Sequence, residues 1–330
     1  MRRLLPLATA LLLLATPATA TATATTDADA GASKGQPTVI GTIPTGPNTR
    51  MVAFTPDYEL AYVANGGSDD VSVIDPRRRT EVTRISVGKF PYGVVFDRTG
   101  RFVYVSNRDS NEVSVIDTTT RTVVKTIPVG TAPRLGALKP DGSEVWISST
   151  ASNAVSVIDT RTRTVTHTIP VGTAPRGIAF THGGRHAYVA DSDSDTLSVV
   201  DTATHTKIAT IPVGDEPRGV LITPDGRTAY VSNALGGTIS VIDVRTRTVT
   251  ATIAVGRTPR GITLAAGGRI AYVVNSGSNS VSTFDTRTNK VLGEVPVGTD
   301  PHWSAPGPGN RYILVANSGS STISIVTLHR

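Results

Sequence analysis

The chain of 330 residues contains no cysteine, which excludes disulfides, thiolate metal sites, covalent haem attachment and a lipoprotein anchor. Its formal net charge of +6 is mildly basic, and acidic residues are interspersed among the basic ones. This balance is compatible with an anionic partner but gives little support to nucleic-acid binding. The six histidines are scattered along the sequence, so we expect neither a metal site nor a cofactor.

The first 20 residues have the three parts of a secretory signal peptide. Arg2 and Arg3 form the charged start, residues 4–15 form an apolar run, and Ala18-Thr19-Ala20 offers a cleavage site. The apolar run is too short to cross a bilayer, so no membrane span is expected. Residues 21–37 are rich in alanine, threonine and aspartate, which predicts a disordered linker. We therefore expect a secreted protein, extracellular or in the cell envelope.

The rest of the sequence repeats with a period of 42 residues, without insertion or deletion. Glycine recurs at Gly46, Gly88, Gly130, Gly172, Gly214, Gly256 and Gly298. An aromatic residue recurs at Tyr62, Tyr104, Trp146, Tyr188, Tyr230 and Tyr272. Aspartate ends a Val/Ile-rich run at Asp75, Asp117, Asp159, Asp201, Asp243 and Asp285. Because a short aspartate side chain can accept a backbone hydrogen bond two residues on, these aspartates are interpreted as turn residues.

Each repeat contains four short stretches with β-strand composition, separated by Gly, Asn, Asp and Ser. In the repeat that begins at Pro175, strands are expected over residues 177–181, 186–190, 196–200 and 207–213. Helical periodicity is absent outside the signal peptide. Four-stranded units of about 40 residues are typical of β-propellers.

The last repeat lacks its fourth strand, and residues 38–46 supply a matching one. Their sequence, TVIGTIPTG, corresponds to TVVKTIPVG at residues 122–130. We therefore predict an all-β fold over residues 38–330, a seven-bladed β-propeller with four-stranded blades whose last blade is closed by the N-terminal strand. Closure removes the sheet edges that invite association, and a monomer is expected.

The segments at Tyr62–Asn65, Tyr104–Asn107, Tyr230–Asn233 and Tyr272–Asn275 resemble the YVTN motif. Together with the recurring Pro-Arg-Gly and Val-Gly elements, they make the chain similar to the YVTN-repeat β-propeller family over about residues 38–330. The resemblance implies a secreted or surface-layer binding protein. More distantly, the chain is similar to metal-carrying propellers of nitrogen-oxide reductases, but it lacks the multiple histidines that such metal sites would need.

One position of the repeat is mostly arginine. It lies where the chain enters the first strand of each blade, and these first strands should line the central channel. The seven residues are Arg50, Tyr92, Arg134, Arg176, Arg218, Arg260 and His302. Seven-fold geometry predicts a ring at the channel mouth, and guanidinium groups suit carboxylates, phosphates and sulfates. The alternative is that Pro-Arg-Gly is a blade-entry turn whose arginines pair locally or face water.

Two further sets accompany this ring. Trp303 follows His302 where most repeats have glycine, so it could stack on a ligand, or it could reflect an atypical closing blade. On the same face, the residues that follow the second strand are expected to be left-handed turn residues: Asn65, Asn107, Ser149, Asp191, Asn233, Asn275 and Asn317. The opposite face should carry arginine-rich turns, interpreted mainly as a solvated surface.

Two functions of different class fit this pattern. The near-identity of the blades favours a non-enzymatic binding or scaffold propeller, with a ligand or partner at the arginine-ringed mouth. An anionic small molecule, a cell-wall polymer and a protein partner all remain candidates, whereas nucleic acid is disfavoured. The alternative is a lyase or hydrolase acting on an anionic substrate at the same mouth, with His302 as acid or base. Streptogramin-inactivating lyases share the fold, but a lone histidine gives no catalytic signature.

Overall fold

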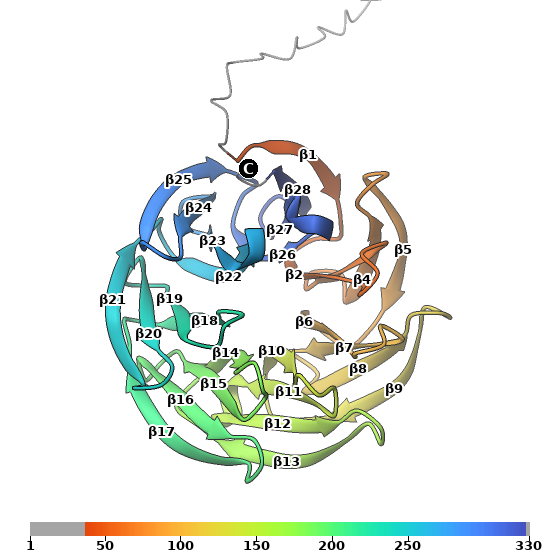
Figure 1. Ribbon diagram of the computed structural model, residues 1–330. Coiled ribbons are helices and arrows are strands. Elements are labelled where there is room, and N and C mark those ends of the chain that lie inside the picture. The colour runs from red at the N-terminus through yellow and green to blue at the C-terminus, as the bar shows by residue number, and fades with distance from the viewer. Residues whose placement is uncertain (1–36, 328–330) are drawn as a thin grey trace, which may run out of the picture. The chain divides into compact units, whose positions relative to one another are not determined.

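The computed structural model describes residues 37–327, so the predicted signal peptide and almost all of the predicted linker lie outside the described residues. The described chain forms seven four-stranded antiparallel sheets, the blades, arranged around one centre (Figure 1). This confirms the predicted seven-bladed all-β propeller. Three short 3-10 helices interrupt the turns: η1 (Thr150–Ser152), η2 (Ala266–Gly268) and η3 (Pro308–Asn310).

Each blade runs from the channel outward in the order of its strands, except the closing blade. The innermost strands are β2 (Thr49–Phe54), β6 (Pro91–Phe96), β10 (Pro133–Leu138), β14 (Pro175–Phe180), β18 (Pro217–Ile222), β22 (Pro259–Ala265) and β26 (Pro301–Pro306). The second strands are β3 (Ala61–Asn65), β7 (Phe102–Asn107), β11 (Glu144–Ser149), β15 (His186–Asp191), β19 (Thr228–Asn233), β23 (Ile270–Asn275) and β27 (Tyr312–Asn317).

The third and fourth strands complete the blades. The third strands are β4 (Asp70–Asp75), β8 (Glu112–Asp117), β12 (Ala154–Asp159), β16 (Thr196–Asp201), β20 (Thr238–Asp243), β24 (Ser280–Asp285) and β28 (Thr322–Thr327). The outer strands are β5 (Thr80–Ser86), β9 (Thr122–Pro128), β13 (Thr164–Pro170), β17 (Thr206–Pro212), β21 (Thr248–Ala254), β25 (Lys290–Pro296) and β1 (Val39–Pro44).

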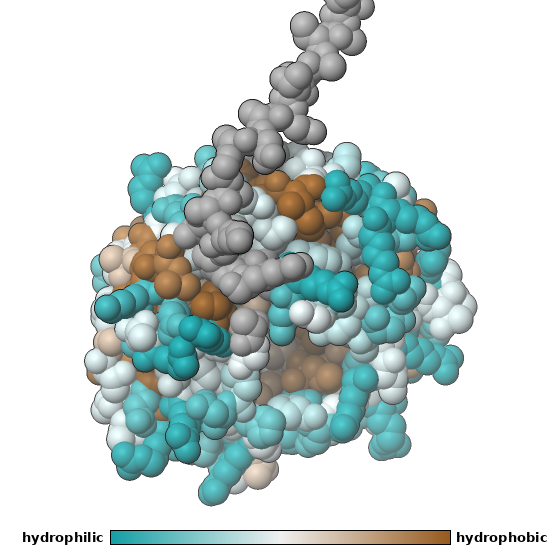
Figure 2. All heavy atoms as spheres, turned by 45° about the horizontal axis from the view of Figure 1, so that its top comes forward, coloured by the Kyte–Doolittle hydropathy of each residue, from teal (hydrophilic) through white to brown (hydrophobic). Residues whose placement is uncertain are grey.

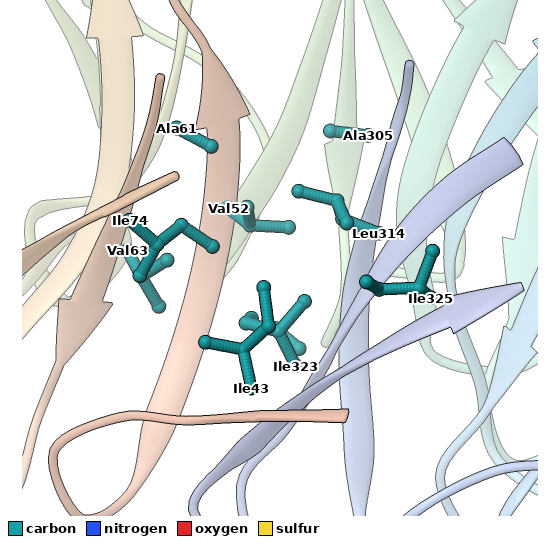
Figure 3. Packing of buried hydrophobic residues seen from close by; sticks show 10 residues of the cluster. Ile43, Val52, Ala61, Val63, Ile74, Ala305, Leu314, Ile323 and Ile325 are labelled. Atoms are coloured by element: carbon teal, nitrogen blue, oxygen red, sulfur yellow. The ribbon is translucent and has the colours of Figure 1, made fainter. Parts of the chain in front are cut away.

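The N-terminal strand β1 closes the ring by pairing antiparallel with β28, as predicted (Figure 1). The Thr38 amide donates to Thr327 Oγ1 at 2.9 Å, and the Thr327 amide donates back to the Thr38 carbonyl at 2.8 Å. Ile43 of β1 is fully buried and belongs to a core cluster with Val52 and Ile323 (Figure 3). The first and last strands therefore share one hydrophobic core.

The two middle strands of each blade are buried on both faces because every blade packs against two neighbours. In β3, for example, all five residues are buried, whereas the outer strand β5 is mostly exposed. This explains the continuous Val/Ile runs of the third strands, since a sheet covered on both sides does not alternate. The recurring tyrosines tie blades together: the Tyr104 hydroxyl donates to the Thr160 carbonyl of the next blade at 3.4 Å.

The prediction that Asn65 and its equivalents are left-handed turn residues is wrong. These residues end the second strands and are fully buried; Asn65 Nδ2 donates to Ser72 Oγ of the third strand at 2.7 Å. They also explain the period-42 glycines, since a Cβ on Gly172 would lie 2.5 Å from Asp191 Cγ. The left-handed position lies four residues later, for example at Asp69, where φ is 55°.

Candidate functional site

The seven predicted ring residues all occupy the second position of an innermost strand. The backbone just before each of them is unusual. Two positions before the ring residue stands a non-glycine residue with a left-handed backbone, for example Phe90 (φ 53°) and Ala174 (φ 53°). Left-handed geometry is costly for side chains such as these, and such strained residues cluster at ligand sites.

A hydrogen bond from the preceding blade holds this strained residue in place. Asn153 Oδ1 accepts from the Ala174 amide at 3.0 Å, two residues before Arg176. Asn279 Oδ1 accepts in the same way from the Asp300 amide at 2.8 Å, two residues before His302. Phe90, Ala132 and Glu216 are held in the same way, so the preceding blade positions five of the seven ring residues.

One cavity at the channel mouth brings most of the predicted residues together. It is lined by Arg50, Tyr92, Leu135, Arg176, Arg218, Arg260, His302 and Trp303. Arg134 is not among these lining residues, but its guanidinium carbon lies 5.1 Å from the centre of the Tyr92 ring. The cavity volume is about 20 Å³, counted as the space that the centre of a water-sized molecule can occupy. It therefore has room for a water or a small charged group between the side chains.

Four of the ring arginines have unused hydrogen-bond donors. Among the described residues, the buried Nε atoms of Arg50, Arg134, Arg176 and Arg218 have no hydrogen-bond partner. Burial lowers the pKa of Arg176 to about 10, and the neighbouring charges of Arg134 and Arg218 act in the same direction. Buried donors are normally paired. The arrangement is therefore electrostatically prepared for an acceptor of negative charge.

Besides Arg50, which contacts His302, two ring arginines have local partners, as the alternative interpretation expected. Arg218 forms an ion pair with Glu216, which stands two residues before it. Arg260 Nε donates to Ser276 Oγ at 2.8 Å. These contacts orient the two guanidinium groups, but the Nε atom of Arg218 still has no hydrogen-bond partner.

Tyr92 occupies the arginine position in its blade and is surrounded by positive charge. The guanidinium carbons of Arg50 and Arg134 lie 5.6 Å and 5.1 Å from its ring centre. Burial by itself raises the pKa of the Tyr92 hydroxyl, but the charges of Arg134, Arg260, Arg176 and Arg50 together outweigh burial and lower the pKa to about 8. The hydroxyl is therefore a group that can change charge at mildly alkaline pH.

His302 is buried, and both of its ring nitrogens are engaged. Nε2 lies 3.1 Å from Asp300 Oδ2, and Arg50 Nη1 lies 3.2 Å from Nδ1 and 3.0 Å from Nε2. Because a carboxylate only accepts, the network assigns the proton to Nε2 and leaves Nδ1 to accept from Arg50. Burial lowers the pKa of His302 to about 4, so the imidazole is neutral at pH 7. His302 thus orients Arg50 and has no free nitrogen for proton transfer in this arrangement.

Sequence reasoning missed three residues of the site. Asp300 and Glu216 stand two positions before ring residues and bind them directly, a spacing that could have indicated contact on one loop. Leu135 stands next to Arg134, where four blades have glycine, and lines the cavity. Its large side chain at a glycine position was the available signal.

The arginine-rich turns lie on the face opposite the ring. In the view of Figure 2, hydrophilic residues cover much of the surface, with hydrophobic patches between them. The recurring aspartates act as turn residues, as predicted: Asp75 Oδ1 accepts from the amides of Arg77 and Arg78, each at 2.9 Å. Arg163 does more than face water, since its guanidinium carbon lies 3.7 Å from the centre of the Phe102 ring in the neighbouring blade. These turns therefore contribute to blade packing.

Within the part of the chain that the structure covers, no group of three or more His, Asp or Glu side chains is placed to hold a metal ion. Over residues 37–327, none of the helices has the length and hydrophobicity needed to cross a bilayer.

Two family models match overlapping stretches of the chain. A YNCE-like β-propeller model matches residues 39–185, and a model described as a seven-bladed β-propeller lactonase matches residues 162–296. No curated protein matches the chain. Among solved structures, Kuenenia stuttgartiensis hydrazine synthase is similar with a TM-score of 0.78 and 20% identity, over 85% of this chain and 96% of that chain. At this identity the likeness concerns the fold. The comparisons therefore support a β-propeller, and the two family models show similarity to the YNCE-like and lactonase-type β-propeller families.

Proposed function

We propose that this chain is an exported, non-enzymatic binding propeller that holds an anionic ligand at the arginine-ringed channel mouth. The observation that carries the proposal is the convergence of Arg50, Arg176, Arg218 and Arg260 on one cavity, where the buried Nε donors of the first three have no hydrogen-bond partner. An anion would supply the missing acceptors and relieve the mutual repulsion of the guanidinium groups. The neutral, fully engaged His302 favours binding over catalysis.

Export and family are part of the same proposal. The charged start, apolar run and small-residue site of the first 20 residues support secretion. The four YVxN segments support a YVTN-repeat type of propeller. A small anion, an anionic cell-wall polymer and an acidic protein segment share the chemistry that this mouth would recognise, and the screen below separates the first two.

The test is a thermal-unfolding screen of the mature protein with sulfate, phosphate, carboxylates and anionic wall glycans. An anion at about 100 times its Kd should stabilise the protein by about 2.7 kcal/mol, which corresponds to roughly 5–10 °C in Tm for a domain of this size. The double variant Arg176→Ala/Arg218→Ala should lose most of this shift. Its matched control, Arg161→Ala/Arg245→Ala, removes the same charge from exposed turns of the opposite face and should keep it.

The stability of the variants without ligand adds a second criterion. Since repulsion and burial disfavour the charged arginines, the ring variant should be at least as stable as the wild-type protein when no anion is present. A ring variant that is strongly destabilised, or that responds to anions like its control, would show that the arginines serve the fold instead.

A hydrolase or lyase acting on an anionic substrate at the same mouth is the second candidate. The match to the lactonase model over residues 162–296 favours this alternative. It requires His302 to release Asp300 or Arg50 before it can transfer a proton. If the wild-type protein hydrolyses anionic lactones, and His302→Ala loses hydrolysis but still binds them, the enzymatic function is established. If the wild-type protein shows no turnover, the binding function is retained.

A further inference from the structure

A second cavity adjoins the arginine ring, between the innermost strands of the first and last blades. It has a volume of about 320 Å³ and is lined mainly by apolar and aromatic side chains of β2, β26 and the turn after β2, among them Met51, Phe54, Tyr58 and Pro306. Trp303 lines both this cavity and the ring cavity. The two spaces therefore meet at the indole of Trp303.

Trp303 is a departure that the fold does not require. Four of the seven blades have glycine at this position, at Gly93, Gly177, Gly219 and Gly261. The indole packs over the glycine of the preceding blade, where a Cβ on Gly261 would lie 3.0 Å from Trp303 Cδ2. The large side chain thus has a fixed place on the channel wall.

Tyr58 is a second departure, and it lies in the same cavity. It stands at a turn position where five blades have glycine, yet its backbone is left-handed with φ at 59°. A bulky residue in this conformation is strained. The ring of Tyr58 lies 5.5 Å from that of Phe54 and remains 39% exposed. Two residues that break the repeat therefore place aromatic surface along one groove that ends at the arginines.

Resting on the proposed anion-binding function, we propose that the ligand is an amphiphilic organic anion, with its charged head at the arginine ring and its apolar body along Trp303 in the groove between β2 and β26. The ring cavity of about 20 Å³ admits a charged group but not the body of a ligand. The adjoining cavity, at about 320 Å³, has the size and apolar lining typical of small-molecule sites. Charge complementarity selects the head, and hydrophobic burial selects the body.

The test uses octanoate, with acetate and 1-octanol as probes of the head and the body alone. Trp146→Tyr, which introduces the residue found in five of the other six blades, leaves Trp303 as the single tryptophan and makes its fluorescence a reporter of the groove. Each buried methylene should tighten binding about fourfold, so octanoate should bind at least about 100-fold more tightly than acetate. The uncharged octanol should bind more weakly than octanoate.

Two variants separate the groove from the ring. Tyr58→Gly, which relieves backbone strain, should reduce octanoate affinity roughly tenfold and leave acetate affinity unchanged. Its control, Leu235→Ala, removes an apolar side chain that is 76% exposed elsewhere and should have no effect. Arg176→Ala/Arg218→Ala should weaken both acids.

The possible outcomes distinguish this inference from the proposed function. Equal affinities for octanoate and acetate, both lost in the ring variant, would overturn the amphiphile and keep the anion site. Octanoate binding that the ring variant retains would overturn both. No response to either acid would overturn the amphiphile, while sulfate or phosphate binding in the thermal screen would still support the anion site.

Discussion

Tyr92 should make anion binding depend on pH. Burial raises the pKa of its hydroxyl, but the surrounding arginine charges lower it to about 8. Above this pH the hydroxyl becomes a phenolate inside the ring and competes with an external anion for the same guanidinium groups. The dissociation constant for sulfate should therefore be constant below pH 8 and rise above it.

The size of the effect follows from the distances at the ring. The guanidinium carbons of Arg50 and Arg134 lie 5.6 Å and 5.1 Å from the centre of the Tyr92 ring, so an anion on them lies close to the phenolate. At roughly 6 Å and an effective dielectric constant of about 20, the repulsion is about 2.8 kcal/mol for each unit of charge on the anion, so the limit for divalent sulfate is well above about 100-fold. Between about pH 7 and pH 9 the dissociation constant should rise about tenfold.

The stability of the protein without ligand should increase as the pH rises, whereas its affinity for sulfate should decrease. The folded-state pKa of Tyr92 is about 8, below the ordinary value of 10, so folding favours the phenolate. Ionisation of Tyr92 should therefore raise the free energy of unfolding of the wild-type protein by about 2–3 kcal/mol relative to Tyr92→Phe. This gain should be complete above pH 10 and should disappear as the pH falls through 8.

Calorimetric titration with sulfate, which does not itself titrate in this range, measures the affinity, and denaturant unfolding measures the stability. Measurements should stay below about pH 9.5, because the pKa of Arg176 is lowered to about 10. In Tyr92→Phe both pH dependences should flatten. A variant that keeps the wild-type pH profile, or a wild-type affinity that does not change between pH 7 and pH 9, would refute the placement of Tyr92 among the charged arginines.

Three further substitutions test the packing. Asp191→Asn should stabilise the protein at neutral pH, because burial raises the pKa of this carboxyl and so disfavours its charged form. The gain in free energy of unfolding over the wild-type protein should grow as the pH rises through the ordinary aspartate range and shrink in acid, which denaturant unfolding will measure. Gly172→Ala should lower Tm, since its Cβ would meet Asp191 at 2.5 Å, whereas Gly183→Ala, with nothing within 4 Å, should be neutral. Ile43→Ala should lower the free energy of unfolding by about 2–5 kcal/mol, because Ile43 is fully buried. Ile40→Ala, at a residue of the same strand that is 44% exposed, should lower it far less. Equal losses would mean that β1 does not cover the hydrophobic core.

The sequence by itself determined the blade count, the four strands of each blade and the closing role of β1. It also placed the ring residues correctly at the start of the innermost strands. These features repeat every 42 residues and rest on local causes, namely strand composition and turn residues. A repeated local pattern can be recognised without knowing which blades touch.

Local composition failed where burial decided the role of a residue. Asn65 and its equivalents have the composition of a turn, yet they end buried strands, because their amides pair with the serine of the adjacent third strand. The sequence distance to that serine, seven residues, carries no turn signal. Only the strand register reveals the pairing.

The chemistry of the mouth was decided by tertiary structure alone. His302 meets Arg50, which is 252 residues away in the sequence, and the apolar groove forms where the first and last innermost strands come together. The pKa values of Tyr92 and Arg176 likewise depend on charges contributed by other blades. Electrostatic interaction and cavity shape depend on distance in space, and closure of the ring creates distances that the repeat does not encode.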